Sequence, residues 1–181
     1  MNELPSAVFL DRDGTIIVDR AYISRPEEVE LIDGAAEAIA RINSSLVPVV
    51  VVTNQSGIGR GYFSEADYER VKERVDQLLA RRGARIDATY FCPHKPEDHC
   101  QCRKPGRLLF DNAARDLGID LRKALLIGDR FRDIEPAAAF GARGVLVPGA
   151  HTPPEEVARA MKSARVADSL ATALDWYLCT N

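Results

Sequence analysis

Four short, continuously apolar segments constrain the fold of this chain more than any other feature. They cover residues 7–10, 47–52, 124–127 and 144–147, and the first three stop abruptly at polar residues or glycine. Apolar runs this short are typical of strands buried on both faces, as in parallel sheets. Longer segments with apolar residues at helical spacing separate them, so the sequence predicts an α/β fold with a doubly wound parallel sheet.

Helical patterns lie between and after these segments. Apolar residues at helical spacing predict helices over residues 34–42, 64–82, 108–117 and 134–140. Ser64 can cap the second of these helices, because an acidic residue stands three positions further on. The tail after residue 153 is expected to form one or two covering helices, whose inward-facing residues are Val157, Met161, Leu170 and Leu174.

The size and charge of the chain limit the classes of function. Its 181 residues fit one domain with one sizeable core, so we expect a single domain over residues 1–181. A net charge of −3 argues against binding to nucleic acid or to an anionic membrane. The first residues do not resemble a signal peptide, and the longest apolar run, residues 46–52, is too short to cross a bilayer. We therefore expect a soluble, cytoplasmic monomer.

Polar residues follow the predicted strands at three points. Asp11, Thr53 and Asp129 each occupy such a strand end. In open α/β sheets, ligands bind beyond the carboxyl ends of the strands near a topological switch point. We therefore expect three distant segments of the chain to converge on one cleft.

The strongest chemical signal is the run from Asp11 to Thr15, an Asp-Arg-Asp-Gly-Thr turn directly after a strand. The Asp11 carboxylate can attack phosphorus and form an acyl phosphate, which divides one difficult displacement into two easier ones. Asp13 can protonate the leaving alcohol and later deprotonate the attacking water. Aspartates that merely cap backbone amides in a turn are the alternative.

A second acidic segment, from Gly128 to Asp133, is expected beside the first. Such a cluster needs a cation, and Mg²⁺ prefers carboxylate oxygens, water and substrate phosphate as ligands. Asp11 and Asp129 are the predicted carboxylate ligands of Mg²⁺, and the backbone carbonyl of Asp13 is the predicted third. Asp133 either orients these groups or only interacts with a helix dipole, and the sequence leaves both readings open.

Thr53 and Lys104 are the residues expected to bind the phosphate itself. A hydroxyl and an ammonium group can hold the non-bridging oxygens and neutralise the charge that develops on them. Backbone amides from residues 54–57 are expected to help, because phosphate monoesters hydrolyse very slowly without catalysis.

Three cysteines and one histidine crowd into the loop of residues 92–102 as a Cys-x-His…Cys-x-Cys pattern. Three thiolates and one imidazole suit tetrahedral zinc, and four protein ligands make the ion structural. We predict Zn²⁺ on Cys92, His94, Cys100 and Cys102.

This loop allows two further readings. His99 suits zinc less well than His94 because it is adjacent to Cys100, and three free cysteines in a surface loop are the alternative to a metal site. His151 and Cys179 have no role visible in the sequence. A zinc ion here would hold Arg103 and Lys104, the next residues in the chain, at the cleft.

These residues resemble the haloacid dehalogenase (HAD) superfamily of phosphotransferases. Asp11-x-Asp13-Gly14-Thr15 is similar to its first motif, Thr53 to its second, Lys104 to its third and Gly128-Asp129-x-x-x-Asp133 to its fourth. The resemblance spans residues 7–147, and it implies a Mg²⁺-dependent enzyme with a covalent intermediate on Asp11. The segments between the motifs are too short for a cap domain, which implies an open site.

Within this superfamily the chain resembles the branch that contains heptose 1,7-bisphosphate phosphatases and histidinol-phosphate phosphatases. Both carry a similar zinc loop followed by Arg-Lys-Pro, here residues 103–105. Residues 53–61 and 19–22 are more similar to the heptose enzymes, so a heptose bisphosphate is the first expected substrate and histidinol phosphate the second. A non-catalytic scaffold is a remote third reading. The resemblance implies substrate contacts from Asp19, Arg20, Ala21, Tyr22, Thr53, Asn54, Gln55, Ser56, Arg103, Lys104 and Arg130.

Overall fold

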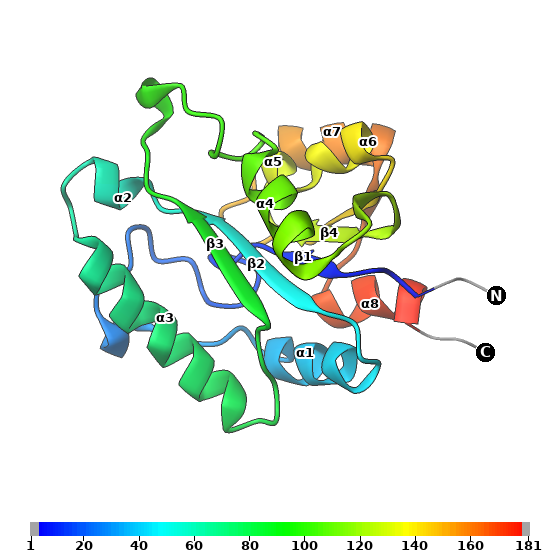
Figure 1. The fold of residues 1–181 in the computed structure, drawn as a ribbon, viewed down its shortest axis with the longest axis horizontal. Coiled ribbons are helices and arrows are strands. Elements are labelled where there is room, and N and C mark those ends of the chain that lie inside the picture. Colours follow the sequence, from blue (N-terminus) through cyan, green and yellow to red (C-terminus); the bar gives the residue numbers. More distant parts are fainter. Residues whose placement is uncertain (1–3, 179–181) are drawn as a thin grey trace.

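The computed structural model describes residues 4–178, which form a six-stranded sheet with helices on both faces (Figure 1). Every pair of neighbouring strands is parallel, in the order β3-β2-β1-β4-β5-β6. The predicted doubly wound α/β fold is therefore confirmed. The strands are β1 (Val8–Leu10), β2 (Val49–Asn54), β3 (Ala88–Cys92), β4 (Leu125–Gly128), β5 (Arg143–Leu146) and β6 (Arg165–Val166).

Eight α-helices accompany the strands within the described residues, and three short 3₁₀ turns lie at Pro26–Glu28, Pro96–Asp98 and Leu121–Lys123. Figure 1 shows α1 and α8 on one side of the sheet and α4 and α6 on the other. The helices are α1 (Ala35–Ser44), α2 (Ser56–Gly59), α3 (Glu65–Ala80), α4 (Leu108–Leu117), α5 (Phe131–Ile134), α6 (Pro136–Phe140), α7 (Pro154–Ser163) and α8 (Leu170–Leu178).

The core lies on both faces of the sheet because successive strand residues point to opposite sides. In β1, Val8 and Leu10 join the cluster formed with α1, α3 and α8, whereas Phe9 joins the cluster formed with α4 and α6. Both faces of the central strands are thus dry, which explains why these strands appear in the sequence as continuous apolar runs.

Local signals at the helix ends explain where several of them begin. The hydroxyl of Ser64 accepts a hydrogen bond from the Asp67 amide at 3.2 Å, and the Asp67 carboxylate accepts one from the Ser64 amide at 2.7 Å. This reciprocal cap confirms the predicted start of α3. The helix predicted over residues 134–140 begins at Pro136, which is favoured at the first helical position, and forms α6. A separate short helix, α5, precedes it and was not predicted.

One expectation about the tail is wrong. Val157, Leu170 and Leu174 face inward as predicted, but Met161 is 69% exposed. The helix α7 buries only a narrow strip, in which the small side chain of Ala160 takes the inward position instead. Cys179 lies outside the described residues.

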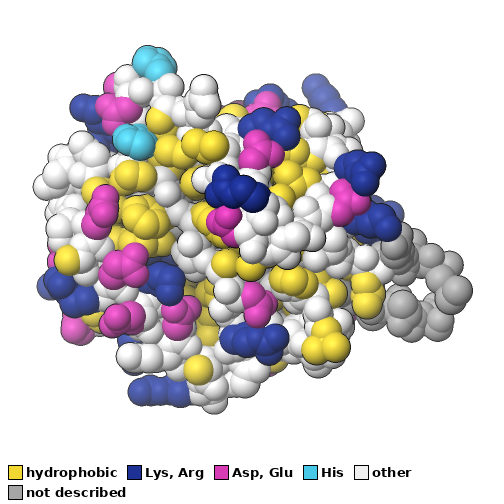
Figure 2. All heavy atoms as spheres, viewed as in Figure 1, with side chains coloured by type: hydrophobic (Ala, Val, Ile, Leu, Met, Phe, Trp, Pro, Cys, Tyr) yellow, Lys and Arg dark blue, Asp and Glu magenta, His cyan; other side chains and the backbone are white. Residues whose placement is uncertain are grey.

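The surface agrees with the modest net charge of the chain. Figure 2 shows acidic and basic side chains intermingled over the visible face. Among residues 4–178, no helix is both long and apolar enough to cross a membrane.

Candidate active site

Three strand ends meet at the centre of the sheet, where β1 lies between β2 and β4. The chain winds outward from β1 through β2 to β3, and then returns to β4 on the other side of β1. The topological switch point therefore lies between β1 and β4, where ligands of open α/β sheets bind. Asp11 follows β1, Thr53 stands near the end of β2 and Asp129 follows β4, so the three segments converge as predicted. Asp11 and Asp129 line a common cavity, whereas Thr53 is buried and lines neither cavity of the site.

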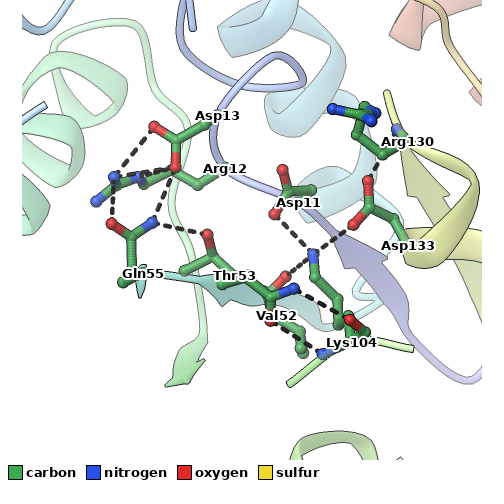
Figure 3. A network of polar contacts seen from close by, with 10 residues as sticks. Asp11, Arg12, Asp13, Val52, Thr53, Gln55, Lys104, Arg130 and Asp133 are labelled. Carbon is green, nitrogen blue, oxygen red and sulfur yellow. Dashed lines mark hydrogen bonds and ion pairs between the residues drawn. The ribbon is translucent and has the colours of Figure 1, made fainter. Parts of the chain in front are cut away.

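Lys104 occupies the middle of this convergence (Figure 3). Its ammonium nitrogen lies 2.7 Å from Asp11 Oδ1 and 2.8 Å from Asp133 Oδ1, and it donates to the Val52 carbonyl at 2.5 Å. Burial lowers the pKa of Lys104, but the two carboxylates outweigh it and hold that pKa above its usual value. The side chain is therefore a fixed positive charge beside Asp11.

The backbone of Lys104 is fixed by Asn54. The Asn54 side chain accepts from the Lys104 amide at 2.9 Å and donates to the Lys104 carbonyl at 3.2 Å. This pair of bonds joins the end of β2 to a segment 50 residues further along the chain. It explains how a lysine outside any helix or strand is held at the site.

The carboxylates of Asp11, Asp129 and Asp133 form a buried acidic cluster, in which one oxygen from each lies within 4.8 Å of the others. Burial, opposed in part by Lys104, raises the pKa of Asp11 to about 6. Burial and then the charges of Asp11 and Asp133 raise the pKa of Asp129 to about 8. Asp129 Oδ1 is buried and has no hydrogen-bond partner. Such a cluster is unfavourable unless a cation neutralises it.

The residues around this cluster fit a divalent cation. They line a cavity of about 50 Å³ with five carboxyl groups against three cationic side chains, so the acidic groups outnumber the basic ones by two. The Gly14 position also requires glycine, because a Cβ there would lie 2.5 Å from Asp129 Oδ2 and φ is +83°. The turn after β1 thus leaves space directly beside the cluster.

Asp133 is engaged by two neighbours. Its Oδ2 accepts from the Arg130 amide at 2.9 Å at the start of α5, and its Oδ1 pairs with Lys104. Asp133 therefore caps the start of α5 and also contacts Lys104, so its contacts are not limited to the helix terminus.

Asp13 points away from Asp11 into a network with Arg12 and Gln55 (Figure 3). Arg12 donates to both Asp13 oxygens at 3.1 and 3.2 Å, and Gln55 Nε2 donates to Asp13 Oδ2 at 2.9 Å. Gln55 Nε2 also donates to Thr53 Oγ1 at 2.9 Å, and its Oε1 accepts from Arg12. The Arg12 guanidinium is buried over the ring of Tyr68, 5.4 Å from the centroid. The sequence reasoning missed this role of Arg12, although its place between two aspartates was a signal.

A larger cavity of about 280 Å³ opens beside Asp13. Of the residues predicted to contact substrate, Asp19, Ala21, Tyr22, Asn54, Gln55, Ser56 and Arg103 line it. Arg20 does not, because its guanidinium pairs with Glu30 on the surface. Arg130 lines only the smaller cavity, and Glu156 binds it at 2.6 Å. Arg132, which the sequence reasoning did not single out, lines both cavities.

The Cys-x-His…Cys-x-Cys loop brings its four predicted ligands together, and His99 is not among them. The three sulfur atoms lie 3.1 to 3.5 Å apart, and His94 Nδ1 lies 3.2 Å from Cys102 Sγ. A tetrahedron with metal–ligand distances of about 2.1 to 2.3 Å has edges of about 3.4 to 3.8 Å, so these four atoms need to spread only slightly to surround an ion. No disulfide joins these three cysteines. The residues fit a zinc ion.

The loop also contacts the substrate side of the site. The Pro93 carbonyl accepts from the Gly59 amide at 2.9 Å, and a Cβ at Gly59 would lie 2.8 Å from that oxygen. The His94 carbonyl accepts from the Arg103 guanidinium at 3.2 Å. The cysteine cluster therefore positions both α2 and Arg103.

This fold and this arrangement of aspartates and lysine define a class of enzyme. Residues 6–136 match the family described as polynucleotide kinase 3 phosphatase, and residues 101–173 match the family described as HAD-hydrolase-like. The chain belongs to the HAD-like phosphatases, which hydrolyse phosphoric monoesters.

Within this class it closely resembles D-glycero-beta-D-manno-heptose-1,7-bisphosphate 7-phosphatase. The Escherichia coli (strain K12) protein of that name is 43% identical over 143 residues, which cover 74% of this chain and 73% of the relative. The protein from Haemophilus ducreyi is 38% identical over 144 residues, which cover 76% of this chain and 79% of the relative.

Solved structures agree with these relatives. The D,D-heptose 1,7-bisphosphate phosphatase from B. bronchiseptica, crystallised with magnesium and phosphate, is 34% identical with a TM-score of 0.86 and covers 95% of this chain and 98% of its own. A HAD-like phosphatase from Mesorhizobium loti is also 34% identical, with a TM-score of 0.80, and covers 100% of this chain and 90% of its own.

Proposed function

We propose that this chain removes the 7-phosphate of D-glycero-D-manno-heptose 1,7-bisphosphate in a Mg²⁺-dependent reaction with Asp11 as the nucleophile. The observation that carries the mechanism is the buried contact of Lys104 with Asp11 beside the unpartnered carboxylate oxygen of Asp129. The substrate is inferred from relatives of about 40% identity and from the charge of the larger cavity.

The reaction proceeds in two displacements. A carboxylate oxygen of Asp11 attacks phosphorus, the bond to the sugar oxygen breaks, and the leaving oxygen takes a proton from Asp13. Water then attacks the aspartyl phosphate, gives its proton to Asp13 and releases inorganic phosphate. Lys104 holds a non-bridging oxygen throughout, and Arg12 and Gln55 hold Asp13 in position.

A bound Mg²⁺ would be held by the carboxylates of Asp11 and Asp129 and the backbone carbonyl of Asp13, and it would neutralise charge on the phosphoryl oxygens. The excess of two acidic groups over basic ones around the smaller cavity supports this ligand set. Zn²⁺ on the cysteine cluster would serve structure only, since four protein ligands complete its coordination.

The larger cavity favours a bisphosphate over histidinol phosphate. Three arginines and two aspartates line it, so its net charge suits a second anionic group better than an ammonium group. Ser56, rather than an acid, follows Asn54-Gln55 in this part of the site. We also propose that the enzyme acts in the heptose metabolism that supplies lipopolysaccharide synthesis. In this proposal it is a cytoplasmic monomer with one domain over residues 1–181.

The test is a comparison of kcat/KM for heptose 1,7-bisphosphate and histidinol phosphate with Mg²⁺ present. The proposal expects a clear preference for the bisphosphate, and equal values would refute the substrate assignment. The Asp11→Asn variant should remain folded by circular dichroism, lose turnover and form no phosphoenzyme. Normal turnover by that variant would show that Asp11 is not the nucleophile. If the wild type hydrolyses no phosphorylated metabolite, the non-catalytic scaffold becomes the better interpretation.

A further inference from the structure

The cationic side chains of the site differ in whether an acid neutralises them. Lys104 lies between Asp11 and Asp133, and Arg12 is bound by Asp13. Arg130 is bound by Glu156, whose two oxygens accept from its Nε at 3.1 and 3.2 Å. These charges belong to the resting network of the protein.

Arg132 is different. It lines both the cavity with the acidic cluster and the larger cavity beside it. Among residues 4–178 no carboxylate pairs with it, although sixteen such ion pairs occur elsewhere in that part of the chain. Its Nε is buried and has no hydrogen-bond partner. A buried charged donor without a partner is costly, which indicates that an anion completes its bonding.

Arg103 is a second guanidinium of this kind. It lines the larger cavity, its only hydrogen bond within the described residues is to the His94 carbonyl, and no acid pairs with it there. Arg103 and Arg132 both line the larger cavity, so their two guanidinium groups face the same space. Two planar forks on one cavity form a receptor for a tetrahedral dianion, because each can bind two of its oxygens.

The position of this pair separates it from the reacting centre. Lys104 and Asp11 do not line the larger cavity, whereas Arg103 lines that cavity alone and Arg132 lies where the two cavities adjoin. A group held by both arginines would therefore belong to the part of the substrate that is not transferred.

We propose that Arg132 is a specificity-determining residue, which binds together with Arg103 the second phosphate of a sugar bisphosphate while the first reacts at Asp11. This inference rests on the proposed function and adds the residue that selects a doubly phosphorylated substrate. Arg130, two positions earlier, is excluded from that role by its bonds to Glu156.

The experiment compares Arg132→Gln with the wild type on heptose 1,7-bisphosphate and on heptose 7-phosphate, which lacks the second phosphate. Loss of charge-assisted hydrogen bonds should lower kcat/KM for the bisphosphate by about ten- to a hundredfold, mainly through KM. Turnover of the monophosphate should change by less than about threefold. Arg132→Lys should recover part of the loss, since it keeps the charge and not the fork.

Arg122→Gln is the matched control, because Arg122 is exposed, pairs with Asp120 and lies at the opposite end of β4. Three outcomes would overturn the inference. Equal losses on both substrates would place Arg132 on the transferred phosphoryl group, and an unchanged bisphosphate preference would show that Arg132 does not select it while the proposed function stands. If the wild type itself shows no preference for the bisphosphate, the proposed substrate fails and the inference fails with it.

Discussion

At the scale of single residues, neighbouring side chains hold the acids and Lys104 of the site in place. Asp11, Lys104 and Asp129 come together because motif spacing and strand order both demand it. The partners of Asp13 could not be predicted in the same way. Arg12 is adjacent in sequence, but its burial depends on the ring of Tyr68 from α3, which only the folded chain brings near.

Gln55 provides a test of this difference. The sequence predicts a substrate contact, whereas the structure shows every polar atom of its side chain engaged with Asp13, Thr53 or Arg12. We expect Gln55→Leu to lower kcat about tenfold or more with little change in KM, because Asp13 loses a donor that orients it. Steady-state kinetics of this variant and of Gln77→Leu, an exposed position on α3, would check this. A rise in KM with unchanged kcat would instead support a direct contact between Gln55 and the substrate.

Asp129 governs how stability depends on pH when Mg²⁺ is absent. Its pKa is raised to about 8 in the folded chain, above the unfolded value near 4, so the protonated form favours folding. The contribution of protonated Asp129 to the free energy of unfolding is fully present below about pH 4 and is lost as the pH rises towards 8. We therefore expect Asp129→Asn to be more stable than the wild type by about 2 kcal/mol at pH 8 in magnesium-depleted buffer.

Thermal unfolding of both proteins between pH 5 and pH 8 would measure that difference. The advantage of Asp129→Asn should shrink as the pH falls, and added Mg²⁺ should stabilise only the wild type. A constant difference across this range would show that Asp129 is ionised in the folded protein throughout.

At the scale of elements, helices and strands with a strong hydrophobic pattern were predicted well, and those with a weak pattern were not. The helix α4 begins and ends where the apolar spacing places it. The strand β3 was not predicted, because four of its five residues are only half-buried and its last residue, Cys92, is also the first cysteine of the cysteine loop. The two-residue strand β6 is too short to leave any periodic signal.

The cysteine loop is an element whose order depends on its proposed ion. We expect Cys100→Ser to lower the bound zinc first and stability next, by about 3 kcal/mol or some 6–12 °C in Tm. Activity on the bisphosphate should fall as well, because the loop positions Arg103 through the His94 carbonyl. Metal analysis and thermal unfolding would test this, with Ser163→Ala, an exposed position at the end of α7, as the control. Full zinc content in the variant would exclude Cys100 as a ligand.

At the scale of the whole molecule, the strand order brings the residues of the site together, and the connections around the site are too short to cover it. The connections from β1 to α1 and from β3 to α4 run only from residues 11 to 34 and from 93 to 107. Neither forms a separate domain over the larger cavity, so the selection of substrate depends on the loops and arginines that line it.

The central position of the site has a dynamic consequence. Amides of β1, β2 and β4, which have strand partners on both sides, should exchange their hydrogens slowest, and those of β6, at the edge, fastest. Hydrogen-exchange mass spectrometry would check this order. Protection of β6 equal to that of β1 would show that its outer edge is covered in solution.

The ammonium of Lys104 has one further consequence. It has three N–H donors, and in the resting protein oxygen atoms of Asp11, Asp133 and Val52 surround it. In the proposed reaction, an incoming phosphoryl oxygen must displace one of these three oxygens, so the number of hydrogen bonds to the nitrogen does not increase. Lys104 would then accelerate the reaction through the attraction between its fixed positive charge and the phosphoryl group. The number of hydrogen bonds that its nitrogen makes would stay the same from one turnover to the next.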